Sequence, residues 1–180
     1  MKKIIILVGP SGSGKSTLEA MLVKELGCSK IVSHTSRAPR AGEIDGVDYH
    51  YVDKDYFNNN LEDFLEVVNF GDNFYGVHKD SLPDGLSVLV AEPNGAVQIS
   101  EYSKKHREVS TLMIYLDVSK ETQVKRMLSR GDSEEMVSKR MEIDNISDNV
   151  HMVQFNIEFN TEIISQKDIV NGIKEALNAG

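Results

Sequence analysis

Uninterrupted apolar runs and segments with helical periodicity alternate along much of the chain. The clearest run, residues 4–8 (IIILV), is rich in β-branched residues and has no polar alternation, as in a strand buried on both faces of a parallel sheet. Residues 15–26 follow with leucine and methionine at helical spacing, and Gly27 ends this predicted helix. The same reasoning predicts further strands at 30–36, 86–92, 111–118 and 155–161, and further helices at 120–130, 134–146 and 169–177. Alternating buried strands and helices predict an α/β fold, a central parallel sheet with helices on both faces.

Residues 33–84 interrupt this alternation of buried strands and helices. Residues 47–52 (VDYHYV) alternate between apolar and polar positions, which predicts a partly exposed antiparallel strand. A helix is expected at 53–64, with short extended pieces at 64–70 and 73–76. We therefore expect one domain with an inserted subdomain at 33–84.

Composition and charge narrow the class of protein. The 180 residues carry a net charge of −8, which argues against a general nucleic-acid binder. The single cysteine, Cys28, excludes a disulfide framework and a cysteine-based zinc site, and it suits a reducing cytoplasm. The apolar run at 4–8 is too short for a signal peptide core or a membrane span. We expect a cytoplasmic protein without a membrane or nucleic-acid partner, either a monomer or a homodimer.

Residues 9–16 (GPSGSGKS) match the pattern G-x-x-x-x-G-K-[ST] in full, between a predicted strand and a predicted helix. Glycines let successive backbone N–H groups turn toward phosphate oxygens, and the helix that follows adds its positive N-terminus. In such a loop Lys15 reaches the β- and γ-phosphates and the Ser16 hydroxyl binds Mg²⁺. The expected ATP-binding residues are Gly9, Ser11, Gly12, Ser13, Gly14, Lys15, Ser16 and Thr17.

A second informative stretch is residues 33–52 (SHTSRAPRAGEIDGVDYHYV). Arg37 and Arg40 lie three positions apart, with Ser33 before them and Tyr49 after a glycine-containing turn. Guanidinium and hydroxyl groups that converge on one point would bind a phosphate. Taken alone, the stretch is equally compatible with a solvated basic loop.

Several motifs in order resemble the guanylate kinase family of P-loop nucleoside monophosphate kinases. Besides the P-loop and residues 33–52, residues 64–76 (FLEVVNFGDNFYG) resemble the family's F-x-E…G-x-Y-Y-G segment, and residues 129–141 (SRGDSEEMVSKRM) resemble its lid. The resemblance implies a P-loop core (1–32, 85–118 and 147–180), a subdomain at 33–84 that binds the nucleoside monophosphate, and a helical lid at 119–146. It also implies transfer of the γ-phosphate from Mg·ATP to GMP or dGMP.

The resemblance assigns a role to each matching residue. The acceptor phosphate would be held by Ser33, Arg37, Arg40, Tyr49 and Tyr75. Glu66 would read the base, because a carboxylate can accept hydrogen bonds from both N1–H and the 2-amino group of guanine. Glu43 matches a family acid near the acceptor, and Glu92 is also expected to contact the substrate, although it stands where the family has an aspartate. Catalytic roles fall to Lys15, Arg37 and the lid arginines Arg126, Arg130 and Arg140, which would neutralise charge on the transferring group.

Three departures from the family pattern bear on the acceptor. Val77 stands where the family has Ser or Thr as a donor to guanine O6. Val90 and Glu92 stand in place of two aspartates, which leaves Glu92 as the remaining candidate for Mg²⁺ support and ribose contact. The lid turn is one residue shorter than usual, which bears on how Arg130 points.

Two alternatives remain open at this stage. A related kinase would use another or modified nucleotide, or ribose 1,5-bisphosphate, as its acceptor, but Glu66 and the complete 33–52 stretch argue against the sugar phosphate. A guanylate-kinase-like module would instead bind a phosphorylated peptide without catalysis. Such modules generally have a degraded P-loop, whereas Lys15 and Ser16 are intact here.

Overall fold

A five-stranded parallel sheet forms the core of the computed structural model, which describes residues 1–40, 42–146 and 150–179. The strand order is β2-β7-β1-β8-β9. The strands are β1 (Lys2–Val8), β2 (Ser29–Lys30), β7 (Gly85–Val90), β8 (Val109–Asp117) and β9 (Ile157–Asn160). The predicted parallel α/β core is therefore confirmed.

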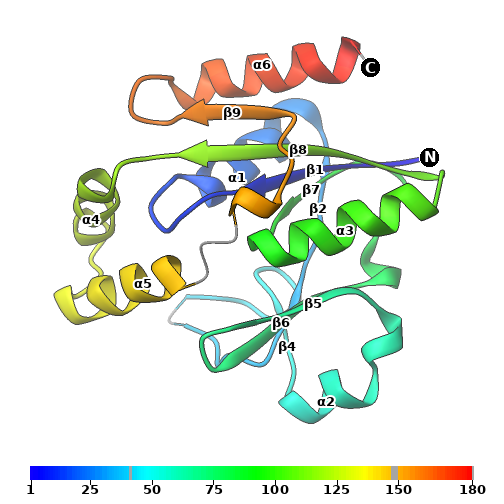
Figure 1. Ribbon diagram of the computed structural model, residues 1–180, viewed down its shortest axis with the longest axis horizontal. Helices are drawn as coiled ribbons and strands as arrows, with labels where there is room; N and C mark the ends of the chain where they lie inside the picture. The colour runs from blue at the N-terminus through cyan, green and yellow to red at the C-terminus, as the bar shows by residue number, and fades with distance from the viewer. Residues whose placement is uncertain (41, 147–149, 180) are drawn as a thin grey trace.

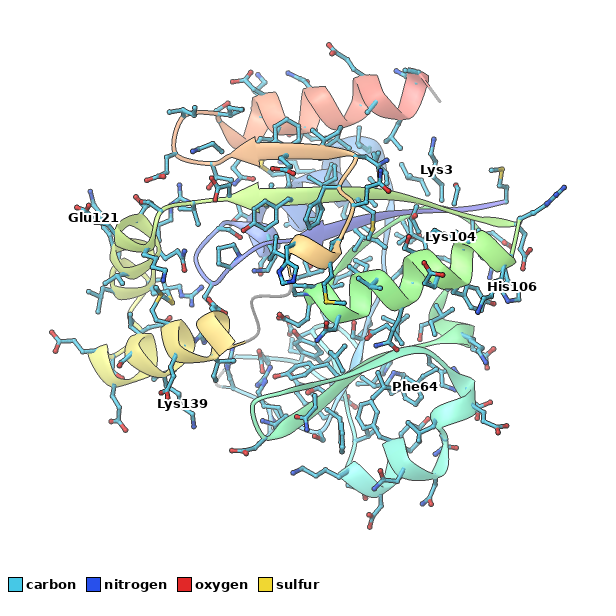
Figure 2. The ribbon with its side chains drawn as sticks, viewed as in Figure 1. Lys3, Phe64, Lys104, His106, Glu121 and Lys139 are labelled. Atoms are coloured by element: carbon cyan, nitrogen blue, oxygen red, sulfur yellow. The ribbon has the colours of Figure 1, made fainter. Side chains whose placement is uncertain are left out.

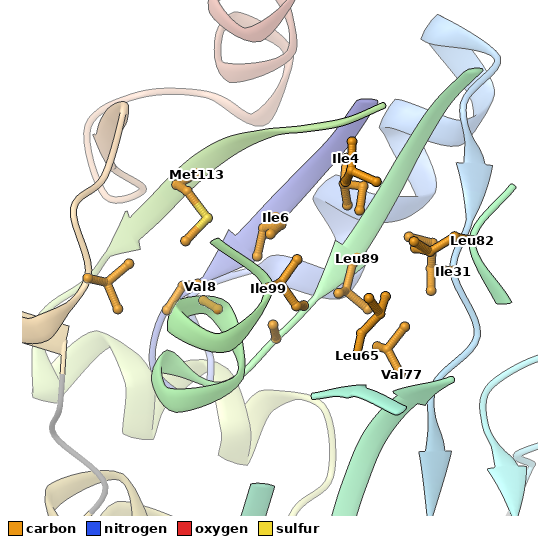
Figure 3. Close-up of a cluster of buried hydrophobic side chains, with 14 residues drawn as sticks. Ile4, Ile6, Val8, Ile31, Leu65, Val77, Leu82, Leu89, Ile99 and Met113 are labelled. Atoms are coloured by element: carbon orange, nitrogen blue, oxygen red, sulfur yellow. The ribbon is translucent and has the colours of Figure 1, made fainter. Parts of the chain in front are cut away.

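Helices cover both faces of this sheet (Figure 1). Ile5 and Leu7 of β1 pack in an apolar cluster with α1 (Lys15–Leu26) and α6 (Gln166–Ala179). Ile4, Ile6 and Val8 point to the opposite cluster, which includes α3 (Pro93–Lys105) and is shown in Figure 3. The apolar run in β1 is uninterrupted because successive side chains are buried on opposite faces.

The helix α3 was not predicted from the sequence, although it covers one face of the sheet. Pro93 and Gly95 at its start are typical of a turn. Proline is nevertheless well tolerated in the first turn of a helix, where its missing N–H would have no partner within the helix.

A second sheet, order β4-β3-β6-β5, lies beside the core. Its strands are β3 (His34–Thr35), β4 (His50–Tyr51), β5 (Phe64–Phe70) and β6 (Asn73–His78), and β5 and β6 form an antiparallel hairpin. The prediction of an antiparallel strand at 47–52 was wrong, because β4 runs parallel to β3. The connection over positions 36–49 is long enough for the crossover that parallel pairing requires.

Two other predicted elements differ from the structure. The expected strand at 30–36 is divided between β2 of the central sheet and β3 of the second sheet. The expected helix at 53–64 is a shorter helix, α2 (Lys54–Asn59), and a 3-10 turn, η1 (Leu61–Asp63). The Asn60 side chain donates a hydrogen bond to the Tyr56 carbonyl, which occupies an acceptor at the end of α2. Phe57 of α2 stacks on Phe64 of β5, which is labelled in Figure 2.

Two helices stand at the carboxyl end of the central strands (Figure 1). They are α4 (Lys120–Ser129) and α5 (Glu134–Ile146), and short 3-10 turns lie at η2 (Lys79–Ser81) and η3 (Val150–Met152). In the described parts of the chain, no helix combines the length and apolar character needed to cross a membrane.

Candidate active site

The loop between β1 and α1 has the glycine-dependent geometry of a phosphate-binding loop. Gly12 and Gly14 have φ angles of 78° and 93°, in the left-handed region that favours glycine. A Cβ atom on Gly12 would lie 3.1 Å from the backbone of Gln123, so α4 packs directly on the loop. The loop leads straight into α1, so its N–H groups and the helix N-terminus form an anion-binding site.

Lys15 is partly buried at the first position of α1. Its Nζ donates hydrogen bonds to the carbonyls of Gly9 (2.6 Å) and Pro10 (2.9 Å). Burial lowers the pKa of Lys15, and the carboxylates of Glu92 and Asp144 oppose this shift. The lysine is thus held against the loop by carbonyls that a phosphate would replace as partners.

Most of the predicted site residues lie around one cavity of about 430 Å³. Its lining includes loop residues Ser11, Gly12, Gly14, Lys15, Ser16 and Thr17, second-sheet residues Ser33, Arg40, Tyr49, Glu66 and Tyr75, and Glu92, Arg126, Arg130 and Arg140. Val68, Val90 and Ala91 complete the lining. Segments far apart in sequence therefore bring lysine, arginine, hydroxyl and carboxylate groups to one place.

Arg37 and Glu43 are not part of that lining; they bind each other. Arg37 Nη1 and Nη2 donate to the two carboxylate oxygens of Glu43, each at 2.9 Å. Glu43 also accepts from the Arg40 backbone N–H (2.7 Å) and the Tyr51 hydroxyl (2.8 Å). Burial alone would raise the pKa of Glu43, but these hydrogen bonds lower it to about 2. The Arg37–Glu43 pair therefore braces the loop that carries Arg40.

Gly9 and Ser13 also lie outside the cavity lining, within the phosphate loop itself.

Two tyrosines face the cavity from neighbouring strands and loops. The rings of Tyr49 and Tyr75 meet edge to face with centroids 5.9 Å apart, and Arg37 lies 5.3 Å from the Tyr49 ring centre. Burial raises the pKa of Tyr49 to about 12. Its hydroxyl, like that of an ordinary tyrosine, is protonated at neutral pH and can donate a hydrogen bond to an anion.

Glu66 is a buried carboxyl at the wall of the cavity, only 6% exposed. Its Oε2 has no hydrogen-bond partner among the described residues. Burial raises the pKa of Glu66 to about 8, against a hydrogen bond from the Val77 backbone, and Glu92 adds to the rise. Val77 is fully buried in the apolar cluster of Figure 3 and does not line the cavity. A buried carboxyl at the wall of a cavity, with one oxygen that lacks a partner, is suited to a ligand that donates hydrogen bonds.

The arginines of the helical pair have different partners. Arg126 donates to the Gly12 carbonyl (3.1 Å) and to the Thr161 side chain and carbonyl (2.9 and 2.7 Å). Arg130 donates to Asp132 through Nε (2.9 Å) and Nη2 (2.6 Å), and Arg140 lies 3.8 Å from the same carboxylate. Asp132 therefore keeps two of the cavity's arginines together.

A second groove, which the sequence did not indicate, adjoins the phosphate loop. It is lined by Gly14, Thr17, Arg126, Thr161, Glu162, Ile163, Ile164, Ser165 and Gln166. Residues 161–166 directly follow β9, and ligands of open α/β sheets bind beyond the carboxyl ends of the strands. The position of these residues after a predicted strand was the signal that could have found them.

The donor atoms near Ser16 fit a magnesium ion. No group of three or more His, Cys, Asp or Glu side chains in the described residues could hold a metal by itself. Ser16 and Glu92 line the same cavity, and both offer the oxygen ligands that Mg²⁺ prefers. Mg²⁺ commonly takes few protein ligands and several from water and substrate phosphates, so such a sparse set is suitable.

Comparisons with known proteins agree with this geometry. A model of the family "Guanylate kinase" matches residues 1–179. The chain is 36% identical over 191 residues to the guanylate kinase of Histophilus somni (strain 129Pt), covering 97% of this chain and 90% of that protein. It is 35% identical over 189 residues to the guanylate kinase of Clostridioides difficile (strain 630), covering 96% and 88%. The crystal structure of guanylate kinase from Anaplasma phagocytophilum has the same fold, with a TM-score of 0.68 at 24% identity over 99% of this chain and 85% of that one.

Proposed function

This chain belongs to the guanylate kinase family, and we propose that it transfers the γ-phosphoryl group of Mg·ATP to GMP or dGMP within the cavity of about 430 Å³. The observation that carries this proposal is that Lys15, four arginines and Glu66 line one cavity. They combine a site for phosphates with a carboxyl that can read a guanine. The other open alternatives, a ribose 1,5-bisphosphate kinase and a phosphopeptide-binding module, are not favoured, since the matched relatives are guanylate kinases.

The donor nucleotide is proposed to lie along the phosphate loop. Backbone N–H groups of residues 12–17 and the N-terminus of α1 would hold its phosphates, with Lys15 at the terminal one. The groove formed by Arg126 and residues 161–166 would receive its nucleoside part, because this groove shares Gly14 and Thr17 with the loop.

The acceptor nucleotide is proposed to lie on the second sheet. Ser33, Arg40, Tyr49 and Tyr75 supply cationic and hydroxyl donors for its phosphate. Arg37 would act indirectly, because its ion pair with Glu43 braces the loop that carries Arg40. Glu66 would accept hydrogen bonds from guanine N1–H and the 2-amino group once its carboxyl is ionised.

The chemical step requires no protein nucleophile. An oxygen of the GMP phosphate attacks the γ-phosphorus in line, a new P–O bond forms, and the bond to the β–γ bridging oxygen breaks to release ADP. Lys15, Arg130 and Arg140 would stabilise the charge on the equatorial oxygens. The role of the protein is positioning, charge stabilisation and exclusion of water.

Mg²⁺ is proposed as the cofactor that neutralises the β- and γ-phosphates when bound. Ser16 would be its direct protein ligand, and Glu92 would accept hydrogen bonds from its water shell. A cytoplasmic location is proposed, because Cys28 is a free thiol and thiols stay reduced in the cytoplasm.

Closure of two parts around the substrates is the proposed conformational step. The second sheet and its connections (33–84) carry the acceptor groups, and the helical pair (119–146) carries the arginines. Their approach on binding both nucleotides would complete the site and exclude water.

A coupled assay of ADP release tests the acceptor. Mg·ATP is supplied with GMP, dGMP, AMP, CMP, dTMP or ribose 1,5-bisphosphate in turn. We expect turnover with GMP and dGMP that exceeds turnover with the other acceptors by at least about a hundredfold. Preferred turnover of another acceptor, or ATP binding without turnover of any, would overturn the proposal.

A further inference from the structure

One carboxylate from α5, beyond the lid motif at 129–141, contacts the phosphate loop. Asp144 lies near the end of α5, and its Oδ2 accepts a hydrogen bond from the Ser11 backbone N–H at 2.8 Å. Its Oδ1 accepts from the Ser11 hydroxyl at 3.3 Å. We propose that Asp144 is a positioning residue, which docks α5 on the phosphate loop and thereby holds Arg140 over the reacting phosphates. This inference rests on the proposed function, because it assigns Arg140 a role in that reaction.

The helix itself links the two residues. Arg140 and Asp144 are separated by one helical turn and so lie on the same face of α5. Arg140 lines the cavity of about 430 Å³. A contact that fixes one end of this turn to the loop therefore restricts where the guanidinium one turn earlier can point.

The contact leaves the phosphate site open. Asp144 does not line the 430 Å³ cavity. It lines a separate cavity of about 220 Å³, together with Gly9, Pro10 and Glu92. The carboxylate thus reaches Ser11 without lining the cavity proposed for the phosphates. This placement favours a docking contact of α5 over an internal anion that competes with ATP.

The charge of Asp144 also suits the loop. Burial lowers the pKa of Lys15 and of Arg140, and the Asp144 carboxylate opposes both shifts. Hydrogen bonds from an N–H and an O–H to one carboxylate are charge-assisted and directional. Docking of Asp144 therefore helps to keep Lys15 and Arg140 positively charged.

Kinetics of Asp144→Ala and Asp144→Asn test this role, with Glu142→Ala as the matched control. Glu142 is an exposed acid on the same helix. We expect Asp144→Ala to lower kcat for GMP by about tenfold to a hundredfold, since small misplacements of catalytic groups have such effects. The Kd for ATP and the KM for GMP should change less than about threefold, because Asp144 does not line the cavity proposed for the nucleotides. Asp144→Asn should recover part of kcat, because its amide oxygen can still accept from Ser11.

A distance measurement without nucleotide separates docking from activity. Spin labels at Lys139→Cys on α5 and Lys104→Cys on α3, both labelled in Figure 2, report the position of the helix while Cys28 stays buried. We expect Asp144→Ala to broaden the distance distribution and Glu142→Ala to leave it unchanged. If Asp144→Ala matches Glu142→Ala in both kcat and distance, the inference is wrong. Tighter ATP binding with a raised kcat would also overturn it, in favour of competition. Inactivity of the wild type toward GMP would refute the proposed function, but the distance experiment would still report on docking.

Discussion

The carboxyl of Glu66 on β5 lies so close to Gly95 of α3 that a side chain at position 95 would collide with it. A Cβ atom on Gly95 would be 2.7 Å from Oε2 and 3.1 Å from Cδ of Glu66. Gly95→Ala should therefore push this carboxyl out of place and raise the KM for GMP by about tenfold or more, with the KM for ATP nearly unchanged. Steady-state kinetics with each substrate varied will measure this, with Glu101→Ala on the exposed side of α3 as the control. Equal effects on both KM values would show a general defect of the fold instead.

GMP binding should release a proton. Because burial raises the pKa of Glu66 to about 8, its carboxyl is mostly protonated at pH 7 without ligand. Guanine that donates two hydrogen bonds favours the ionised form, so binding should release close to one proton at pH 6.5–7 and tighten as pH rises toward 8. Calorimetric titrations in buffers of different ionisation enthalpy will count the protons. Glu66→Gln should abolish the release; an unchanged proton count in this variant would assign the release to another group.

The carboxyl of Glu66 should make the folded protein less stable as pH rises, whereas most acidic residues have the opposite effect. Its pKa in the folded protein, about 8, lies above the ordinary value of 4.5, so the folded state binds the extra proton and loses stability as pH rises through this window. The free energy of unfolding of Glu66→Gln, relative to the wild type, should therefore increase between pH 5 and 8. Urea titrations across this range will show it. A difference that does not vary with pH would mean that Glu66 is ionised in the empty pocket.

Lys15→Ala should lower kcat by at least about a thousandfold, since it removes the cation at the transferring phosphoryl group. Lys24→Ala, an exposed lysine in the last turn of the same helix, is the control. Thermal unfolding of both variants should show that the fold is retained. Residual activity above a tenth of the wild type in a folded Lys15→Ala protein would refute the role of Lys15.

Three histidines should make the second sheet sensitive to acid. The ring of His34 lies 4.7 Å from that of His50 and 5.8 Å from that of His78. Burial and then these two neighbours lower the pKa of His34 to about 4, while Asp45 opposes the shift. The unfolded chain therefore takes up more protons, and stability should fall as pH drops from about 6.5 toward 4. Denaturant titrations will measure the decline, which should be smaller in His78→Gln. An identical decline in this variant would exclude repulsion from His78 as a cause.

Contiguous motifs made the phosphate loop predictable from sequence, whereas contacts between distant segments did not. Gly12, Gly14 and Lys15 owe their geometry to neighbours in sequence, and the loop has the expected form. Asp144 and Ser11 are 133 positions apart, and nothing near either residue indicates their contact. The direction of β4 depends on how a long loop crosses, which local alternation cannot reveal.

The partners of charged residues in the acceptor region were also not predictable from the sequence. Arg37 and Glu43 were each expected at the substrate, yet in the structure they form an ion pair outside the cavity lining. A sequence shows that two charged residues are close along the chain, but not which partner each one takes. Their contributions to substrate binding stay a prediction.

Base discrimination by Glu66 can be tested by measuring kcat/KM for GMP and for AMP in the wild type and in Glu66→Gln. Two hydrogen bonds to a charged group contribute roughly 3 kcal/mol together, so kcat/KM for GMP should fall about a hundredfold. The value for AMP should change less than about threefold, because adenine has no N1–H and no 2-amino group to lose. This outcome would establish Glu66 as the residue that reads guanine. Comparable losses for both nucleotides would show instead that Glu66 is a structural residue of the pocket wall.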